Sequence, residues 1–140
     1  MPGLLVVSHG TLAGELVDAV RRIVSDVEAL EAVSIGWDVD MDQATRRIQE
    51  AIARVERPGG VLVLTDMFGG TPSNLALSLL EPGRIEVVTG VNLPMLIKCV
   101  NLRGEAALLE VAERVAEQGR QSIQVASSLL SARPRGEDAP

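Results

Sequence analysis

The chain is poor in the residue types from which many functional sites are built. Its 140 residues contain one histidine, one cysteine, one tryptophan, one phenylalanine and no tyrosine. The single cysteine, Cys99, excludes an intrachain disulfide and a cysteine-rich zinc site, and a single histidine excludes a metal cage of several histidines. Because aromatic side chains are nearly absent, the stacking platforms that bind single-stranded nucleic acid are absent too.

The charge balance and the hydropathy pattern exclude further partners. Thirteen Lys and Arg residues stand against 19 Asp and Glu residues, a net charge of −6, so a nucleic-acid backbone finds little to attract it. No apolar run approaches the length of a membrane span, and the N-terminus lacks the pattern of a secretory signal. We therefore expect a cytoplasmic protein that binds no nucleic acid and does not insert into a membrane.

Apolar runs alternate with amphipathic segments along most of the chain. The runs predict strands over residues 4–7, 32–39, 61–64 and 85–89. The amphipathic segments predict helices over residues 12–27, 44–55, 72–80, from about 95, and 105–118. This alternation predicts one three-layer α/β domain with a mainly parallel sheet. A further strand is expected over residues 122–130, which would complete a domain of residues 1–130, and residues 131–140 are expected to form a disordered polar tail.

The only histidine, His9, lies where the first predicted strand ends. In parallel α/β sheets, functional groups gather at the carboxyl ends of strands, near the point where the strand order reverses. The third predicted strand ends at Asp66, so the two side chains would lie at one edge if these strands are neighbours. A carboxylate that accepts a hydrogen bond from Nδ1–H leaves the Nε2 lone pair free to attack. The pair therefore predicts a nucleophilic histidine, although both residues also fit ordinary turns.

Two helix starts beside these strand ends predict a place for a phosphoryl group. Gly10 and Thr11 begin one helix, and Gly69 and Gly70 lead into another, with Thr71 expected as its N-cap and Pro72 as its first helical residue. Helix N-termini offer free amides and a positive dipole end, and Thr71 adds a hydroxyl. Such parts can hold a phosphohistidine without a metal or cofactor. The same residues also occur at ordinary helix starts that bind no phosphoryl group.

Three sequence blocks at the strand ends resemble a known family. The blocks are VVSHG at 6–10, TDMFGGTPSN at 65–74 and GVNLPML at 90–96. Together they are similar to the IIA component of the mannose/fructose/sorbose branch of the sugar phosphotransferase system, over nearly the whole chain. The resemblance implies that His9 accepts a phosphoryl group from the carrier HPr and passes it to a IIB component for sugar uptake. It also implies that Asp66 orients His9 and that Thr71, with Gly69 and Gly70, holds the phosphoryl group.

The resemblance further implies an assembly and a second loop. Members of the family are typically homodimers in which a C-terminal strand, here residues 122–130, pairs antiparallel with the sheet of the other subunit. Asn92 and Pro94, in the third block, are predicted to form a secondary loop of the site. The chain departs from the family in two ways: its 140 residues include no IIB-like part, and Phe68 stands where a tryptophan is frequent. We expect the Phe68 ring to fill an apolar wall.

Other functions remain open from the sequence. Two are close to the first: a stand-alone regulatory IIA protein that signals by its phosphorylation state, and the phosphoryl-donor subunit of a dihydroxyacetone kinase. A third, of a different class, is a tetrapyrrole metal chelatase, which also begins with a strand followed by His-Gly but usually needs further histidine or acidic ligands. A fourth is an α/β interaction module without catalysis, in which replacing His9 would change nothing.

Overall fold

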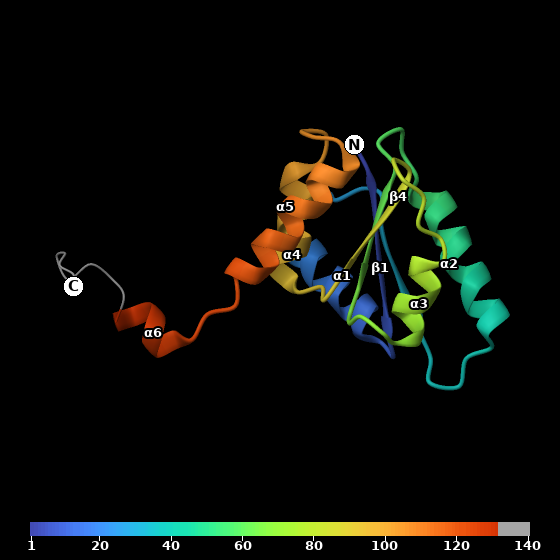
Figure 1. Cartoon of the computed structure of the whole chain (residues 1–140), viewed down its shortest axis with the longest axis horizontal. Helices are drawn as coiled ribbons and strands as arrows, with labels where there is room; N and C mark the ends of the chain where they lie inside the picture. Colours follow the sequence, from blue (N-terminus) through green and yellow to red (C-terminus); the bar gives the residue numbers. More distant parts are fainter. Residues whose placement is uncertain (132–140) are drawn as a thin grey trace.

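The computed structural model describes residues 1–131, in which strands and helices alternate up to β4 and three successive helices follow (Figure 1). The elements are β1 (Gly3–His9), α1 (Leu12–Ile23), β2 (Leu30–Ile35), α2 (Met41–Val55), β3 (Val61–Thr65), α3 (Thr71–Leu77), β4 (Ile85–Thr89), α4 (Leu93–Leu102), α5 (Leu108–Gln121) and α6 (Ala126–Ser131). Of the predicted disordered tail, Ser131 belongs to α6 and the remainder lies outside the described residues.

The four strands form one parallel sheet in the order β2-β1-β3-β4, which confirms the predicted mainly parallel sheet. Every residue of β3 is buried, as expected for an inner strand covered on both faces. From β1 the chain runs to β2 on one side of β1, and it then returns to β3 on the other side of β1. The strand order therefore reverses between β1 and β3. The register pairs Val7 with Thr65, which places the ends of β1 and β3 side by side.

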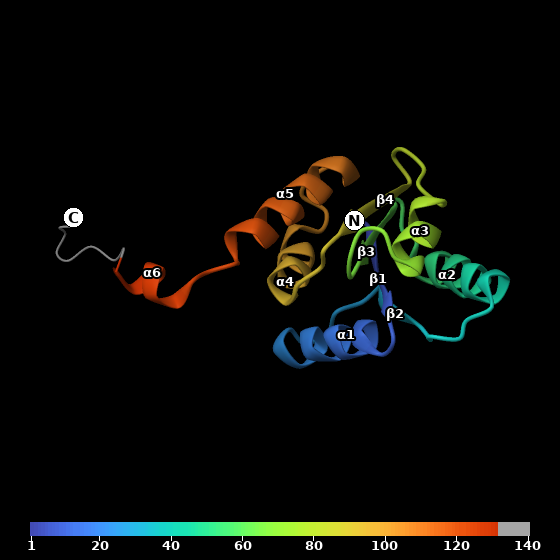
Figure 2. The same cartoon turned by 60° about the horizontal axis from the view of Figure 1, so that its bottom comes forward.

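Helices cover both faces of the sheet, which confirms the three layers. Helices α1, α4 and α5 pack on one face, and α2 and α3 on the other (Figure 2). Successive strand residues point to opposite faces, so Leu4 and Val6 belong to the first core and Leu5 and Val7 to the second. No helix within residues 1–131 is both long and apolar enough to span a membrane.

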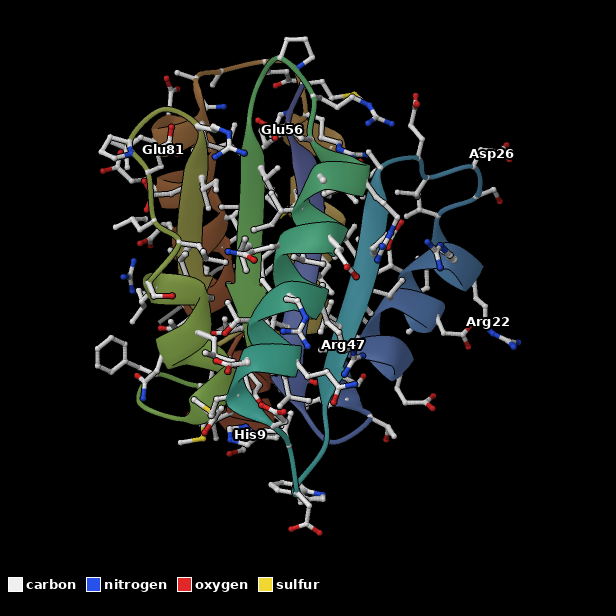
Figure 3. All side chains as sticks on the ribbon, turned by 90° about the vertical axis from the view of Figure 1, so that its right-hand side faces the viewer. His9, Arg22, Asp26, Arg47, Glu56 and Glu81 are labelled. Carbon is white, nitrogen blue, oxygen red and sulfur yellow. The ribbon has the colours of Figure 1, made fainter. Side chains whose placement is uncertain are left out.

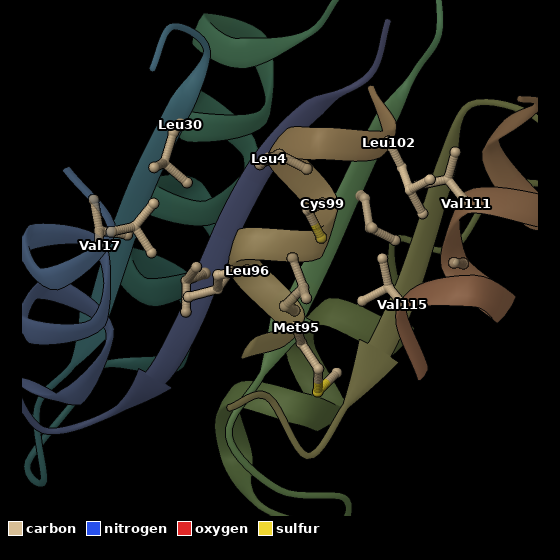
Figure 4. Packing of buried hydrophobic residues seen from close by; sticks show 14 of the residues in the cluster. Leu4, Val17, Leu30, Met95, Leu96, Cys99, Leu102, Val111 and Val115 are labelled. Atoms are coloured by element: carbon tan, nitrogen blue, oxygen red, sulfur yellow. The ribbon is translucent and has the colours of Figure 1, made fainter. Parts of the chain in front are cut away.

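The core on the α4 side encloses the only cysteine (Figure 4). Cys99 is fully buried, and this burial raises the pKa of its thiol to about 12. The thiol therefore stays protonated at neutral pH, and Cys99 is a small core residue rather than a reactive one.

Several helix starts differ from prediction by a residue or more. Gly70, not Thr71, is the N-cap of α3, and Thr71 and Pro72 lie in its first turn. Helix α5 begins at Leu108 rather than at residue 105 because residues 103–107 form a turn and an extended entry. Helix α2 begins at Met41, three residues before the predicted start, and the Asp40 carboxylate caps it by accepting a hydrogen bond from the Asp42 amide at 2.9 Å.

The structure of the single chain contradicts the predicted strand over residues 122–130. Residues 126–131 form α6, which has no buried residue and lies away from the sheet (Figure 1). A strand needs a neighbouring strand to pair its backbone, and no sheet edge adjoins this segment. Its amides bond locally instead, as Leu129 does to the carbonyl of Val125 at 2.9 Å. The described sheet therefore has four strands.

Candidate functional site

His9 and Asp66 meet at the carboxyl edge of the sheet. His9 is the last residue of β1 and Asp66 directly follows β3, and these strands are neighbours. The Asp66 Oδ2 atom accepts one hydrogen bond from Nδ1 of His9 at 2.8 Å and another from the His9 amide at 2.9 Å. Figure 3 shows His9 at this end of the sheet, opposite the end that carries Glu56 and Glu81. The structure thus brings the two predicted residues together.

The hydrogen bond fixes the chemical state of both side chains. Burial raises the pKa of the Asp66 carboxyl, but the hydrogen bonds from the amide and ring of His9 and from the Met67 amide outweigh it, so the net pKa lies below its usual value. Asp66 is therefore an anion at neutral pH and can only accept. Nδ1 of His9 must carry the hydrogen, which leaves the lone pair on Nε2.

Two groups pack against the imidazole, and one of them was not predicted. A Cβ atom at Gly70 would lie 2.5 Å from Cε1 and 2.8 Å from Nε2 of His9, so only glycine permits this approach. Trp37 stacks on the ring with 5.5 Å between ring centroids and an interplanar angle of 23°, which is the geometry of an offset aromatic pair. The predicted strand over residues 32–39 places Trp37 within the sheet, whereas β2 ends at Ile35 and Trp37 lies beyond it.

An open hollow of about 720 Å³ borders the imidazole. Its lining residues are His9, Gly10, Thr11, Leu12, Glu15, Ser34, Gly36, Trp37 and Asp66. The predicted Gly10 and Thr11 thus belong to its wall, whereas Gly70 contacts the imidazole without lining the hollow. Two carboxylates and no arginine or lysine occur among the described lining residues. The hollow therefore offers no positive side chain that would retain a free anion.

Ser8 ties the backbone of His9 to helix α1. Its buried Oγ accepts a hydrogen bond from the Ala13 amide at 2.6 Å and donates to the His9 carbonyl at 3.1 Å. Thr11 occupies the N-cap position of α1 without a side-chain hydrogen bond, so the hydroxyl that caps the helix comes from Ser8. This role of Ser8 was not predicted from the sequence, where the available signal is a serine five residues before an amide in the first turn of a helix.

The loop after Asp66 carries the remaining predicted phosphoryl-binding residues. Gly69 has a φ of +96°, and its amide donates to Ser73 Oγ at 3.3 Å. Thr71 lies in the first turn of α3, directly after the glycine that contacts His9. Phe68 is 72% exposed, so the expectation that it fills an apolar wall is wrong. The chain turns at the neighbouring glycines, and the Phe68 side chain lies in solvent and not in the core.

Asn92 and Pro94 do not line the hollow beside His9. The Asn92 Oδ1 atom caps α4 by accepting from the Met95 amide at 3.0 Å, and its Nδ2 donates to the Gly119 carbonyl at 3.4 Å. Pro94 lies in the first turn of the same helix, where its missing amide hydrogen has no cost. Both residues therefore help to start α4, and Asn92 also joins it to α5.

The site combines one oriented nucleophile with a nearby open hollow. The side chain of His9 is 26% exposed, whereas that of Asp66 is 11% exposed. An imidazole that attacks through Nε2 develops positive charge, and the partly buried Asp66 carboxylate stabilises that charge through Nδ1–H. This arrangement suits the formation and breakdown of a covalent bond at Nε2.

Comparisons with known sequences agree on one family. The family described as "PTS system fructose IIA component" matches residues 3–116. The chain is 30% identical over 131 residues to the PTS system fructose-specific EIIA component of Bacillus subtilis (strain 168), covering 93% of this chain and 90% of that protein. It is 24% identical to the PTS system mannose-specific EIIAB component of Escherichia coli (strain K12), covering 98% of this chain and 42% of that protein.

Solved structures share the fold. The phosphotransferase system component EIIA from Streptococcus agalactiae superposes with a TM-score of 0.82 at 23% identity, covering 91% of this chain and 99% of that one. The mannose/sorbose-specific IIA subunit from Enterococcus faecalis superposes with a TM-score of 0.79 at 27% identity, covering 89% and 93% of the two chains.

Proposed function

Because the chain belongs to the family of fructose IIA components of the phosphotransferase system, and so is a phosphoryl carrier, we propose that it carries the phosphoryl group on His9. The observation that supports this site is the hydrogen bond from Nδ1 of the only histidine to Asp66, at 2.8 Å. That contact makes Nε2 the nucleophile and gives the ring a partly buried counter-charge. Family membership favours this function over a metal chelatase or an interaction module.

The transfer takes place in two displacement steps. In the first, the Nε2 lone pair of His9 attacks phosphorus, and the bond from phosphorus to the donor atom breaks with its electron pair leaving on the donor. Nδ1–H stays hydrogen-bonded to Asp66, and the carboxylate balances the positive charge on the ring. In the second step the acceptor attacks phosphorus, and the electron pair of the phosphorus–Nε2 bond returns to the imidazole. Neither step requires a metal or cofactor.

The phosphoryl group on Nε2 would meet the start of α3. Gly70 lies against the Nε2 edge of the imidazole, and the amide and hydroxyl of Thr71 follow directly. Gly69 provides the turn that brings this backbone to the imidazole, and Gly10 with Thr11 would flank the group from the hollow. Among the described residues that line the hollow there is no arginine or lysine, so backbone amides and the hydroxyl are the groups that would contact the phosphoryl oxygens.

We further propose the partners that the family resemblance implies. HPr would donate the phosphoryl group and a IIB component would accept it, in the cytoplasm, for sugar uptake. The same chemistry serves a regulatory IIA protein or the donor subunit of a dihydroxyacetone kinase, which differ only in the acceptor. The test of the acceptor is therefore separate from the test of the site.

A homodimer is also part of the proposal. Strand β4 lies at the edge of the sheet, where its outer backbone has no strand partner among the described residues. The segment 122–130 is exposed and carries four large apolar side chains: Ile123, Val125, Leu129 and Leu130. We propose that each copy places this segment on the other, where the sheet edge of the partner could pair it as the antiparallel strand that the resemblance implies.

One experiment tests the site. The protein is incubated with phosphoenolpyruvate, enzyme I and HPr, and its mass is then measured. We expect the addition of one phosphoryl group that is labile in acid and stable in base, and we expect His9→Ala to prevent it. Absence of the group from the wild type would reject the proposal, and its persistence in His9→Ala would move the site elsewhere.

A further inference from the structure

Trp37 is a large aromatic residue held at the surface beside the proposed nucleophile. It is 78% exposed and follows the end of β2, whose last residue, Ile35, pairs in register with His9. Leaving the sheet beside β1, the loop carries the indole back over the imidazole, where the two rings stack. Most of the indole therefore faces solvent, and the ring stack with His9 is what places Trp37 at the site.

A second contact fixes the indole in this position. A Cβ atom at Gly10 would lie 3.4 Å from Cζ2 and 3.6 Å from Nε1 of Trp37, so the indole rests on the backbone directly after His9. Gly10 has a φ of +54°, in the left-handed region, which turns the chain sharply under the ring. Trp37 thus packs on two consecutive residues of the site, His9 and Gly10.

We propose that Trp37 is a positioning residue, which holds the plane of the His9 imidazole for transfer and shields the phosphoimidazole from water. The proposal rests on the proposed role of His9 as phosphoryl carrier. Asp66 holds one edge of the imidazole through Nδ1, but a single hydrogen bond still lets the ring tilt about its Cβ–Cγ bond. A ring stacked on one face opposes that tilt.

The stacking leaves the reaction path open. The Nε2 lone pair lies in the plane of the imidazole, whereas the indole lies against its face, so donor and acceptor can approach in line with Nε2. Water that attacks the phosphoimidazole breaks the phosphorus–Nε2 bond, releases inorganic phosphate and returns the electron pair to the ring. An indole over one face removes part of the solvent from which that water comes. Both effects favour transfer to a protein partner over hydrolysis.

Trp37 also provides its own reporter, since it is the only tryptophan. Indole emission depends on the groups in contact with the ring, and phosphorylation of His9 places a charged group next to the stacked pair. We therefore expect the intrinsic fluorescence to change when His9 is phosphorylated. The change should reverse when the phosphoryl group passes to an acceptor or is hydrolysed.

Three variants test the proposal in the full chain: Trp37→Ala, Trp37→Phe and, as a matched control, Phe68→Ala. Phe68 is similarly exposed, at 72%, and lies on the loop that follows Asp66, but it does not stack on His9. We expect Trp37→Ala to slow transfer from phosphorylated HPr by about two- to tenfold, the range set by the energy of an aromatic pair. We expect it to shorten the half-life of the phosphohistidine by a similar factor. Trp37→Phe should retain most of the wild-type transfer rate and most of the wild-type half-life. Phe68→Ala should change neither the half-life nor the orientation of the His9 ring.

The unphosphorylated protein gives a readout that does not depend on the proposed function. The indole ring current should shift the carbon-bound ring protons of His9 in the NMR spectrum, and Trp37→Ala should abolish that shift. If the shift is present but transfer and half-life are the same in Trp37→Ala as in wild type, Trp37 is not a positioning residue. If the shift is absent, the stacking itself is refuted. If the wild type cannot be phosphorylated at all, the carrier function fails while the stacking result stands.

Discussion

The Asp66 carboxylate holds His9 at two points through a single oxygen, since Oδ2 accepts from both Nδ1 of the ring and the backbone amide. The side chain and the backbone of the nucleophile are therefore fixed by one group. We expect Asp66→Asn to slow phosphorylation by about 100-fold, because an amide can present its NH₂ to Nδ1 and stabilise the wrong tautomer. The initial rate of transfer from phosphorylated HPr measures this.

Asp38→Asn is the matched control for that change, because it makes the same substitution at an exposed aspartate on the loop next to Trp37. It should leave the rate within twofold of wild type. Circular dichroism should show both variants folded. Equal rates in Asp66→Asn and wild type would mean that Asp66 does not orient the histidine.

The lowered pKa of Asp66 predicts how its contribution to stability depends on pH. A carboxyl whose pKa is lower in the folded than in the unfolded state stabilises the fold above its unfolded pKa, about 3.9. That contribution is lost as the pH falls through the folded value. The difference in free energy of unfolding between wild type and Asp66→Asn should thus shrink as the pH falls below about 4. Urea unfolding at several pH values measures it, and a difference that grows on acidification would contradict the pKa direction.

Alanine substitutions at two adjacent glycines distinguish a steric effect on the His9 ring from an effect on the backbone conformation. Gly70→Ala would place Cβ against Cε1 and Nε2 of the imidazole although the local φ of −94° suits alanine. Gly69→Ala meets no neighbour but must adopt a φ of +96°. We expect Gly70→Ala to reduce the transfer rate by at least about tenfold with little loss of stability. Gly69→Ala should lower the free energy of unfolding by about 1 kcal/mol.

Transfer rates and chemical unfolding of the two glycine variants check this pair of predictions. The opposite pattern, with transfer lost in Gly69→Ala and retained in Gly70→Ala, would show that the close approach of Gly70 to the imidazole is unimportant.

Ser8→Ala should act on stability more than on chemistry. The change removes the hydroxyl that caps α1 and leaves the buried Ala13 amide without its acceptor. We expect a loss of about 1–2 kcal/mol in the free energy of unfolding. Ser34→Ala, which removes a longer contact of 3.4 Å to the next amide of α1, should cost less. Thermal unfolding of the two variants gives the comparison, and equal losses would argue against the capping role of Ser8.

The proposed homodimer predicts a mass of twice that of the chain by light scattering at micromolar concentration. A truncated chain that ends at Gln121 should remain folded, because no residue of α6 is buried, and should be monomeric. Ile123→Ser should weaken the dimer by exposing less apolar surface for the partner to cover. A monomeric wild-type chain would refute the dimer, and a dimeric truncated chain would place the interface elsewhere.

Much of the fold was predictable because its signals are local. The uninterrupted apolar run at residues 61–64 predicted the buried strand β3, and the spacing of apolar residues over 44–55 predicted the amphipathic helix α2. The end of β2 was placed four residues too late, because residues 36–39 keep an alternating pattern although the chain turns there. Trp37 is one of these residues, and it can stack on His9 because it lies beyond the end of the strand.

The sequence by itself determined the alternation of strands and helices, the single histidine, and the family to which its three blocks point. Those properties depend on residues close together in the chain. The tertiary structure decided that β1 and β3 are neighbours, so that Asp66 meets His9 across 57 positions of sequence. It also decided that Trp37 and Gly70 are the groups that pack against the imidazole. Such contacts arise from strand order and register, which local hydrophobic patterns leave open.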